Sequence, residues 1–252
     1  MYCPLTTIPP IPIRMKSYRY FDLVMAAFVA VLLVSNIASS AKIVDWGVSI
    51  YGLRLSFDGG TLLFPLSYIF GDILTEVYGY AHSRRVIWMG FACSAVMSFF
   101  FFLLSSMPGD ANWMSYAGED KFNAILGGVS SGGIIIASLV AYFCGEFSNS
   151  YVLAKMKVWT EGKWLWTRTI GSTLVGEGID TAAFITIATL FGVFPWSLFW
   201  SLVVANYIFK VSIEVLFTPF TYRAVGFLKR TEQEDFYDRE TDFNPFSVVV
   251  RG

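Results

Sequence analysis

The chain has little charge and almost no histidine. Charged residues make up 15% of its 252 residues, whereas an average soluble domain carries roughly 25%. One histidine, His82, and three cysteines, Cys3, Cys93 and Cys144, are present without metal-ligand spacing or a disulfide framework. The formal net charge is −1 and no basic block occurs. The sequence therefore predicts neither a metal or other cofactor nor a nucleic-acid partner.

Apolar residues are abundant instead. They make up 55% of the chain, aromatic residues make up 18%, and the mean hydropathy is +0.57, which excludes disorder and indicates a polytopic membrane protein in contact with lipid. A membrane span needs about 20 mostly apolar residues. That rule predicts an all-α membrane protein with six transmembrane helices, at 21–41, 60–80, 85–106, 129–151, 169–192 and 196–219.

Lysine and arginine orient these spans. The N-terminal arm, the second and fourth connections and the tail together hold 14 lysines and arginines, whereas the first, third and fifth connections hold three. Because cytoplasmic segments carry the excess of positive residues, both termini are predicted to be cytoplasmic. The chain then divides into an N-terminal cytoplasmic arm (1–20), a transmembrane domain (21–220) and a cytoplasmic tail (221–252).

Two pairs of segments resemble each other. The segment 35–42 is similar to 148–155, and 67–72 is similar to 172–177. We therefore expect two three-helix repeats, 21–106 and 129–219. An odd number of spans in each makes the second repeat inverted relative to the first. Transporters of this architecture place their substrate site at the repeat interface, near the bilayer midplane.

Seven charged residues fall inside the predicted spans: Asp72, Glu76, Glu146, Glu177, Asp180, Lys210 and Glu214. A charge at the bilayer centre costs about 2.5–3.5 kcal/mol, so these side chains must face inward. Six carboxylates exceed what one lysine can neutralise, which favours a polar substrate cavity. Pairing among themselves that only holds the bundle together is the alternative. Four aromatics could stack on a flat ligand ring: Phe64, Tyr68, Tyr78 and Tyr207.

The segment Gly59–Tyr80 resembles the signature of the queuosine precursor transporter family, also described as vitamin uptake transporters. Further agreement lies at 137–142, at 172–181 and from Asn206 through Lys210 to Pro219, so that the resemblance covers about residues 20–230. It implies a six-span carrier of the bacterial inner membrane. Such a carrier imports the 7-deazaguanines preQ0 and preQ1, precursors of the tRNA base queuosine.

The resemblance also implies substrate-binding residues. The strongest matches to the family pattern are Asn36, Asp72, Asp180, Asn206 and Lys210; partial matches are Glu76, Glu177 and Glu214. Asn149, the repeat counterpart of Asn36, and Tyr68 complete the candidates. Asp72 and Asp180 are expected to accept hydrogen bonds from the N–H groups at the donor edge of the nucleobase. One position departs from the family, because Gly133 stands where an arginine is common.

Other classes stay open. One is the membrane substrate-binding subunit of an energy-coupled vitamin uptake complex. Another is a diaspartyl intramembrane enzyme, since two aspartates lie on different spans, although the prediction is that the chain is not an enzyme. A homodimer is compatible with so small a bundle.

Overall fold

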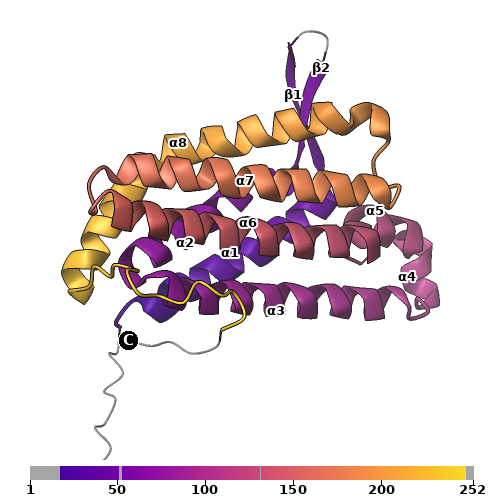
Figure 1. The fold of residues 1–252 in the computed structure, drawn as a ribbon. Coiled ribbons are helices and arrows are strands. Elements are labelled where there is room, and N and C mark those ends of the chain that lie inside the picture. Colours follow the sequence, from indigo (N-terminus) through magenta and orange to yellow (C-terminus); the bar gives the residue numbers. More distant parts are fainter. Residues whose placement is uncertain (1–17, 51–52, 131, 248–252) are drawn as a thin grey trace, which may run out of the picture.

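The computed structural model describes residues 18–50, 53–130 and 132–247; Cys3 and most of the N-terminal arm lie outside them. Within this part of the chain, six helices run antiparallel between the two ends of one bundle (Figure 1). They are α1 (Phe21–Ala41), α2 (Phe64–Tyr78), α3 (Tyr80–Ser105), α6 (Gly132–Trp159), α7 (Leu165–Leu190) and α8 (Phe199–Glu232). Shorter elements connect them: η1 (Gly59–Leu62), α4 (Ala111–Tyr116), α5 (Gly118–Ser130) and η2 (Trp196–Leu198).

Five described segments are long and apolar enough to cross a membrane: Phe21–Ala41, Tyr80–Ser105, Gly118–Trp159, Leu165–Leu190 and Trp196–Glu232. The remaining predicted span, 60–80, corresponds to α2, whose 15 residues extend about 22 Å. Neighbouring helices bury α2 almost completely, so it contacts mainly protein. The other five spans also have an outer face that is expected to contact lipid. Large apolar side chains on the outer faces, such as Phe99, Phe100 and Leu216, are exposed, as expected for contact with lipid.

A β-hairpin joins α1 to η1 where the sequence analysis expected a loop. Strands β1 (Ile43–Ile50) and β2 (Leu53–Asp58) pair antiparallel, with an irregularity between Asp45 and Ser49. Figure 1 shows the hairpin projecting past α8. At its base, the Phe57 ring stacks on that of Phe209 in α8 at 4.8 Å between centroids.

We call the end of the bundle that holds Phe21, Tyr78 and Glu232 the terminal end, and the opposite end the loop end. The turn between α2 and α3 at the terminal end is one residue, Gly79, with φ +84°. A Cβ on Gly79 would lie 2.3 Å from the Phe236 ring, so this turn requires glycine.

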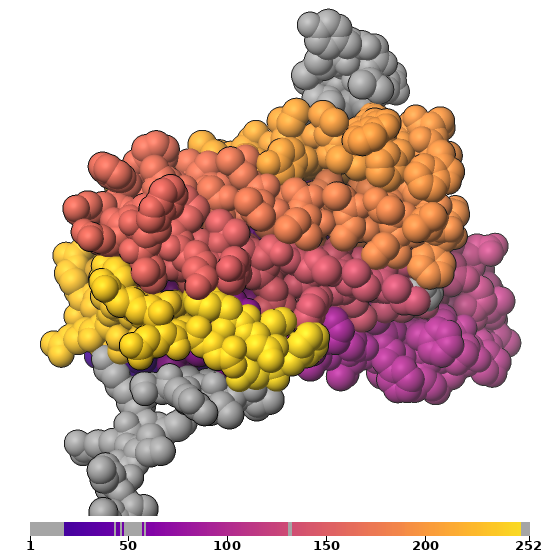
Figure 2. All heavy atoms as spheres, in the orientation of Figure 1, coloured from indigo at the N-terminus to yellow at the C-terminus, as the bar shows by residue number. Residues whose placement is uncertain are grey.

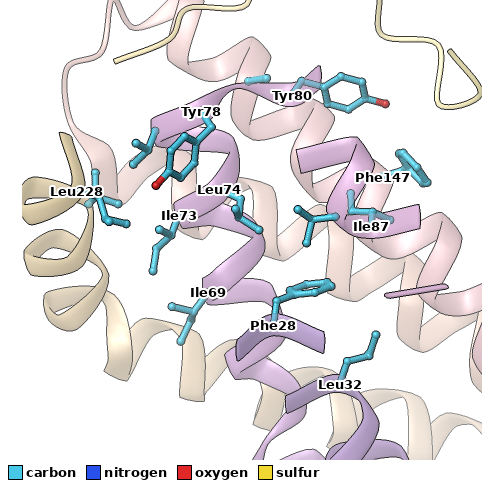
Figure 3. Packing of buried hydrophobic residues seen from close by; sticks show 14 of the residues in the cluster. Phe28, Leu32, Ile69, Ile73, Leu74, Tyr78, Tyr80, Ile87, Phe147 and Leu228 are labelled. Carbon is cyan, nitrogen blue, oxygen red and sulfur yellow. The ribbon is translucent and has the colours of Figure 1, made fainter. Parts of the chain in front are cut away.

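The hydrophobic core fills the terminal half of the bundle. Figure 3 shows α1, α2 and α3 meeting there through buried side chains such as Phe28, Ile69, Leu74 and Ile87. Leu228 of α8 joins the same cluster. The core therefore fixes the position of α2, which carries three of the candidate site residues.

The C-terminal segment after α8 lies on the outside of the bundle (Figure 2, yellow). Helix α8 contains Pro219, which removes a backbone donor, and Figure 1 shows its last turns redirected across the terminal end. The tail is then held by buried groups: Arg84 Nη1 donates to the carbonyls of Asp242 (2.9 Å) and Asn244 (2.7 Å), and Trp88 Nε1 donates to that of Pro245 (2.8 Å).

The described N-terminus meets the tail at this end. Tyr18 Oη donates to Glu234 Oε2 at 3.2 Å, and the backbone N–H groups of Arg19 and Tyr20 donate to Glu232 at 2.9 and 2.6 Å. Burial, reinforced by Glu234, raises the pKa of Tyr18 to about 12, so that its hydroxyl remains a donor at alkaline pH as well.

The similar sequence segments lie at opposite ends of their helices. Residues 35–42 end α1 at the loop end, whereas 148–155 lie toward the terminal end of α6. This placement agrees with an inverted repeat, which itself stays a prediction.

Candidate functional site

A cavity of about 520 Å³ lies in the loop half of the bundle. Its wall combines both halves of the chain, since α1, η1 and α3 line it together with α6, α7 and α8. Most of the wall is apolar. Its charged residues are Asp180 and Lys210, and the candidates Asn36 and Asn206 lie on it as well. A mostly apolar cavity with a few converging polar groups is the usual form of a small-molecule site.

Lys210 and two acids form the charged centre of this wall. Lys210 Nζ on α8 donates to Asp180 Oδ2 on α7 at 2.5 Å and lies 3.0 Å from Glu177 Oε2. The two acids are one helical turn apart, so both face α8. Asp180 and Lys210 reach the cavity, whereas Glu177 is fully buried behind them. The ammonium also lies 4.5 Å from the centre of the Phe64 ring, which lines the cavity.

The two asparagines on the wall have matching local structure. Asn36 Nδ2 donates to the Leu32 carbonyl, and Asn206 Nδ2 donates to the Leu202 carbonyl, each at 2.9 Å. Each amide thereby bonds to its own helix one turn earlier. Within the described residues no hydrogen bond engages their side-chain oxygens, which leaves an acceptor at each position on the wall.

Three further candidates are buried beyond the cavity wall. Asp72 is completely buried on α2 and accepts a hydrogen bond from Asn149 Nδ2 at 2.8 Å. Glu214 is buried on α8, one turn after Lys210. Asp72, expected to share a substrate edge with Asp180, does not line the cavity in this conformation, and neither do Asn149 and Glu214.

The aromatic candidates are dispersed. Tyr68 is completely buried between α6 and α7, where its ring lies against Gly145 and Gly176. Tyr78 belongs to the hydrophobic core, and Tyr207 Oη donates to the Leu174 carbonyl at 3.1 Å. Of these four aromatics, Phe64 is the one that lines the cavity.

Glu76 belongs to a separate ion-pair cluster at the terminal end. Arg168 binds it in bidentate fashion, with Nε to Oε2 and Nη2 to Oε1 both at 2.7 Å. Lys229 Nζ lies 2.5 Å from Oε1, and Lys157 Nζ lies 3.7 Å from the same oxygen. Asp235 in the tail joins the two lysines at 2.6 and 2.7 Å. We call Glu76, Asp235, Lys157, Arg168 and Lys229 the Glu76 cluster.

This cluster changes the charge balance expected from sequence. By sequence, Lys157 and Arg168 fall between the predicted spans 129–151 and 169–192, and Lys229 falls in the predicted tail. In the structure, Lys157 and Arg168 lie in helices at 0% and 1% exposure. They give Glu76 its own counter-charges, whereas Lys210 is the paired cation among the other five acids of the predicted spans in the described structure. The long helices α6 and α7, which extend beyond the predicted spans, carry Lys157 and Arg168 inward.

Gly133, the departure from the family pattern, lies at the start of α6 beside α7. A Cβ at this position would lie 2.9 Å from the Cβ of Phe191, so the backbones approach closely here. An arginine would require Phe191 to move.

Comparison with known proteins identifies a family and a relative. The "Probable queuosine precursor transporter" of Bacillus subtilis (strain 168) is 24% identical over 188 residues, which cover 74% of this chain and 78% of that relative. No solved structure matches the chain significantly. The family described as "Putative vitamin uptake transporter" matches residues 58–224, a range that contains α2, α3, α6, α7 and most of α8. The chain is a multi-pass membrane protein that belongs to this family.

Proposed function

We propose that the chain imports a 7-deazaguanine queuosine precursor, preQ0 or preQ1, across the bacterial inner membrane by alternating access. The observation that carries this proposal is the cavity, in which Asp180, Lys210, Asn36 and Asn206 converge from both halves of the chain. The printed function of the Bacillus relative supplies the substrate class. The cavity volume of about 520 Å³ falls within the range of roughly 300–1,000 Å³ for small-molecule sites.

The chemistry of the wall suits this ligand. A 7-deazaguanine presents a ring N–H beside an amino group, and one carboxylate accepts both. Asp180 is the carboxylate that reaches the cavity, and Lys210 is positioned to donate to the ring carbonyl. The free amide oxygens of Asn36 and Asn206 accept from remaining N–H groups. The ammonium of preQ1 is favoured by the neighbouring Glu177.

Alternating access requires the cavity to open at each end in turn. The terminal half is filled here by the hydrophobic core and the Glu76 cluster. We propose that the two halves, α1–α3 and α6–α8, are the inverted repeats that move against each other. The Glu76 cluster joins α2 to α7 and α8 and must open when the substrate leaves at the terminal end.

Binding to the purified protein tests the site. Calorimetry with preQ1, preQ0, guanine and an unrelated vitamin is expected to show selective binding of the 7-deazaguanines. Asp180→Asn removes a charge-assisted acceptor and should weaken binding by about 1.5–3 kcal/mol, roughly tenfold to 150-fold. Asp120→Asn, an exposed acid outside the cavity, is the matched control and should bind normally.

Two outcomes redirect the proposal. Loss of binding in Asp72→Asn as well as in Asp180→Asn would place both carboxylates on the substrate, and thus extend the site toward α2. Absence of binding by the folded protein would refute the substrate assignment. Uptake into vesicles that contain only this protein separates a carrier from a subunit that depends on an ATP-driven module.

A further inference from the structure

Five carboxyls lie together in the middle of the bundle with one cation. They are Asp72 on α2, Glu146 on α6, Glu177 and Asp180 on α7, and Glu214 on α8; all are at most 3% exposed. Among the described residues, Lys210 is the cation that pairs with any of them. Full ionisation would leave four uncompensated negative charges away from water, which is prohibitively costly. Most of these carboxyls must therefore carry protons in this state.

Buried oxygens without a hydrogen-bond partner occur on four of these acids in the described structure: Asp72, Glu146, Glu177 and Glu214. Glu177 has Lys210 at 3.0 Å, and Asp72 accepts from Asn149 through its other oxygen. Glu146 Oε2 and both oxygens of Glu214 are buried without a hydrogen-bond partner in the described structure. The Tyr68 hydroxyl, also completely buried and unpartnered, lies among the same helices. A permanently protonated carboxyl would normally donate a hydrogen bond, and a permanently ionised one would need a cation. Among the described residues Glu214 has neither, and Glu146 has only a 3.4 Å contact with Ser67, so the arrangement suits carboxyls that change their proton occupancy.

Glu146 lies at the centre of the group. Its Oε1 accepts from Ser67 Oγ at 3.4 Å, and its Oε2 would lie 3.0 Å from a Cβ at Gly71 on α2. The titratable groups around it come from α2, α7, α8 and its own helix: Asp72 and Tyr68 on α2, Glu177 and Asp180 on α7, Glu214 on α8, and Tyr142 on α6. Lys210 on α8 pairs with the two acids of α7.

Asp180 connects this buried group to the cavity. It lines the cavity, binds Lys210, and interacts electrostatically with Glu146. A ligand that engages Asp180 or Lys210 therefore changes the charge that Glu146 and Glu177 experience. This is the physical requirement for coupling substrate binding to protonation, because each event alters the free energy of the other.

We propose that the carrier moves a proton together with its substrate, and that Glu146 and Glu214 hold this proton. The inference rests on the proposed function. One proton is taken from the side to which the cavity opens, resides on a carboxyl of this pair while the substrate occupies the cavity, and is released on the opposite side. A proton neutralises a single carboxyl in place. It does not need several ligands that converge on it, as a metal cation does. One positive charge crosses the membrane in each cycle with a neutral substrate such as preQ0.

The test uses the full chain in proteoliposomes with preQ0, an imposed pH gradient, and the membrane potential clamped by potassium and valinomycin. For one proton per substrate, accumulation is expected to rise about tenfold for each pH unit, acid outside, because one pH unit is a tenfold proton ratio. A trapped pH dye should report acidification of the lumen on addition of preQ0. Replacing sodium with choline should change nothing.

Glu146→Gln separates coupling from transport. This variant keeps the size of the side chain and should retain preQ0 binding and preQ0/preQ0 exchange while losing accumulation driven by the pH gradient. Glu214→Gln should reduce the same accumulation. Asp120→Asn, exposed and remote from the cavity, is the control and should behave as the unmodified chain.

The outcomes distinguish the two proposals. Saturable preQ0 uptake that ignores the pH gradient, or follows sodium, would overturn proton coupling and leave the proposed function standing. Accumulation by Glu146→Gln equal to that of the unmodified chain would overturn the assignment of Glu146. Absence of binding and exchange in the unmodified chain would instead refute the proposed function.

Discussion

Individual charges inside this bundle are stabilised in two different ways. Lys210 is one cation between two acids, beside a cavity, whereas Glu76 is one acid surrounded by three cations and closed off by the tail. A buried charge that loses its partner is costly because no water replaces the lost interaction. Around Lys210 the acids outnumber the cation, which leaves excess negative charge next to the cavity. The second arrangement, the Glu76 cluster, holds the helices and the tail together.

Glu76→Gln should destabilise the fold. It leaves the buried Arg168 and Lys157 without their shared carboxylate, and breaking such a pair costs about 3–5 kcal/mol. The measurement is thermal unfolding in detergent, where the transition should fall by several degrees. Glu161→Gln removes an ion pair with Lys163 whose side chains are 73% and 68% exposed, and its transition should not move. Equal stability of the two variants would refute the structural role of Glu76.

Asp235 gives the tail a pH dependence. Burial tends to raise its pKa, but hydrogen bonds from Lys157 and Lys229 hold this pKa below the usual value of 3.8. A lowered pKa contributes stability above pH 3.8 that is lost as the pH falls through the folded-state value. We expect Asp235→Asn to loosen the tail at pH 7. The difference from the unmodified chain should shrink at acid pH, where both side chains are uncharged.

A spin label at exposed Arg239→Cys, with the native cysteines replaced, measures this loosening through its mobility. Glu240→Gln, which neutralises an exposed acid of the same tail, should leave the spectrum unchanged. A constant difference between Asp235→Asn and the unmodified chain down to pH 2 would contradict the assignment.

At the scale of elements, the crossing of α6 and α7 depends on two glycines in contact. A Cβ on Gly176 would lie 2.7 Å from Asn149 Cβ and 3.1 Å from the Gly145 carbonyl oxygen, whereas one on Gly178 meets nothing closer than Tyr207 at 3.6 Å. Gly176→Ala should therefore cost about 1–3 kcal/mol through overpacking. Gly178→Ala should be neutral or stabilising, because alanine favours a helix.

Thermal unfolding of the two alanine variants provides the comparison. Since Asp180 follows Gly176 by one turn on α7, separation of α7 from α6 should displace this carboxylate, so substrate affinity should fall in Gly176→Ala and stay constant in Gly178→Ala. A Gly176→Ala protein as stable as the unmodified chain would show that the helices separate without penalty.

The sequence predicts some elements of the fold better than others. The helix α1 begins and ends as predicted, because an uninterrupted apolar run specifies both limits. The hairpin was missed, although Leu53, Leu55 and Phe57 alternate with polar residues in the way typical of a strand. Spacing placed Glu177 and Asp180 on one face of their helix, but it did not identify them as the partners of Lys210, because Glu214 lies one turn after Lys210 and was available as well. The bonds from Arg168 and Lys229 to Glu76 could not, because they depend on how distant helix ends meet.

At the scale of the whole molecule, functional groups follow one another along the bundle axis. The cavity occupies the loop half, the unpaired carboxyls lie in the middle, and the hydrophobic core and the Glu76 cluster close the terminal half. A substrate that leaves at the terminal end must pass the carboxyls before the Glu76 cluster opens. In the proposed transport cycle, proton exchange then falls between substrate binding and substrate release.

The number of spans determines where the termini lie. Five long apolar segments alone would place the chain ends on opposite sides, whereas α2 as a sixth passage places them together. The contact of Tyr18 with Glu234 requires the second arrangement. Because the positive residues gather at this end, we expect both termini in the cytoplasm. Green fluorescent protein fused to either end should fluoresce, alkaline phosphatase fused there should be inactive, and phosphatase inserted after Gly109, beyond α3, should be active. Termini that report opposite sides would show that α2 does not cross the membrane, and the inverted repeat would fail with it.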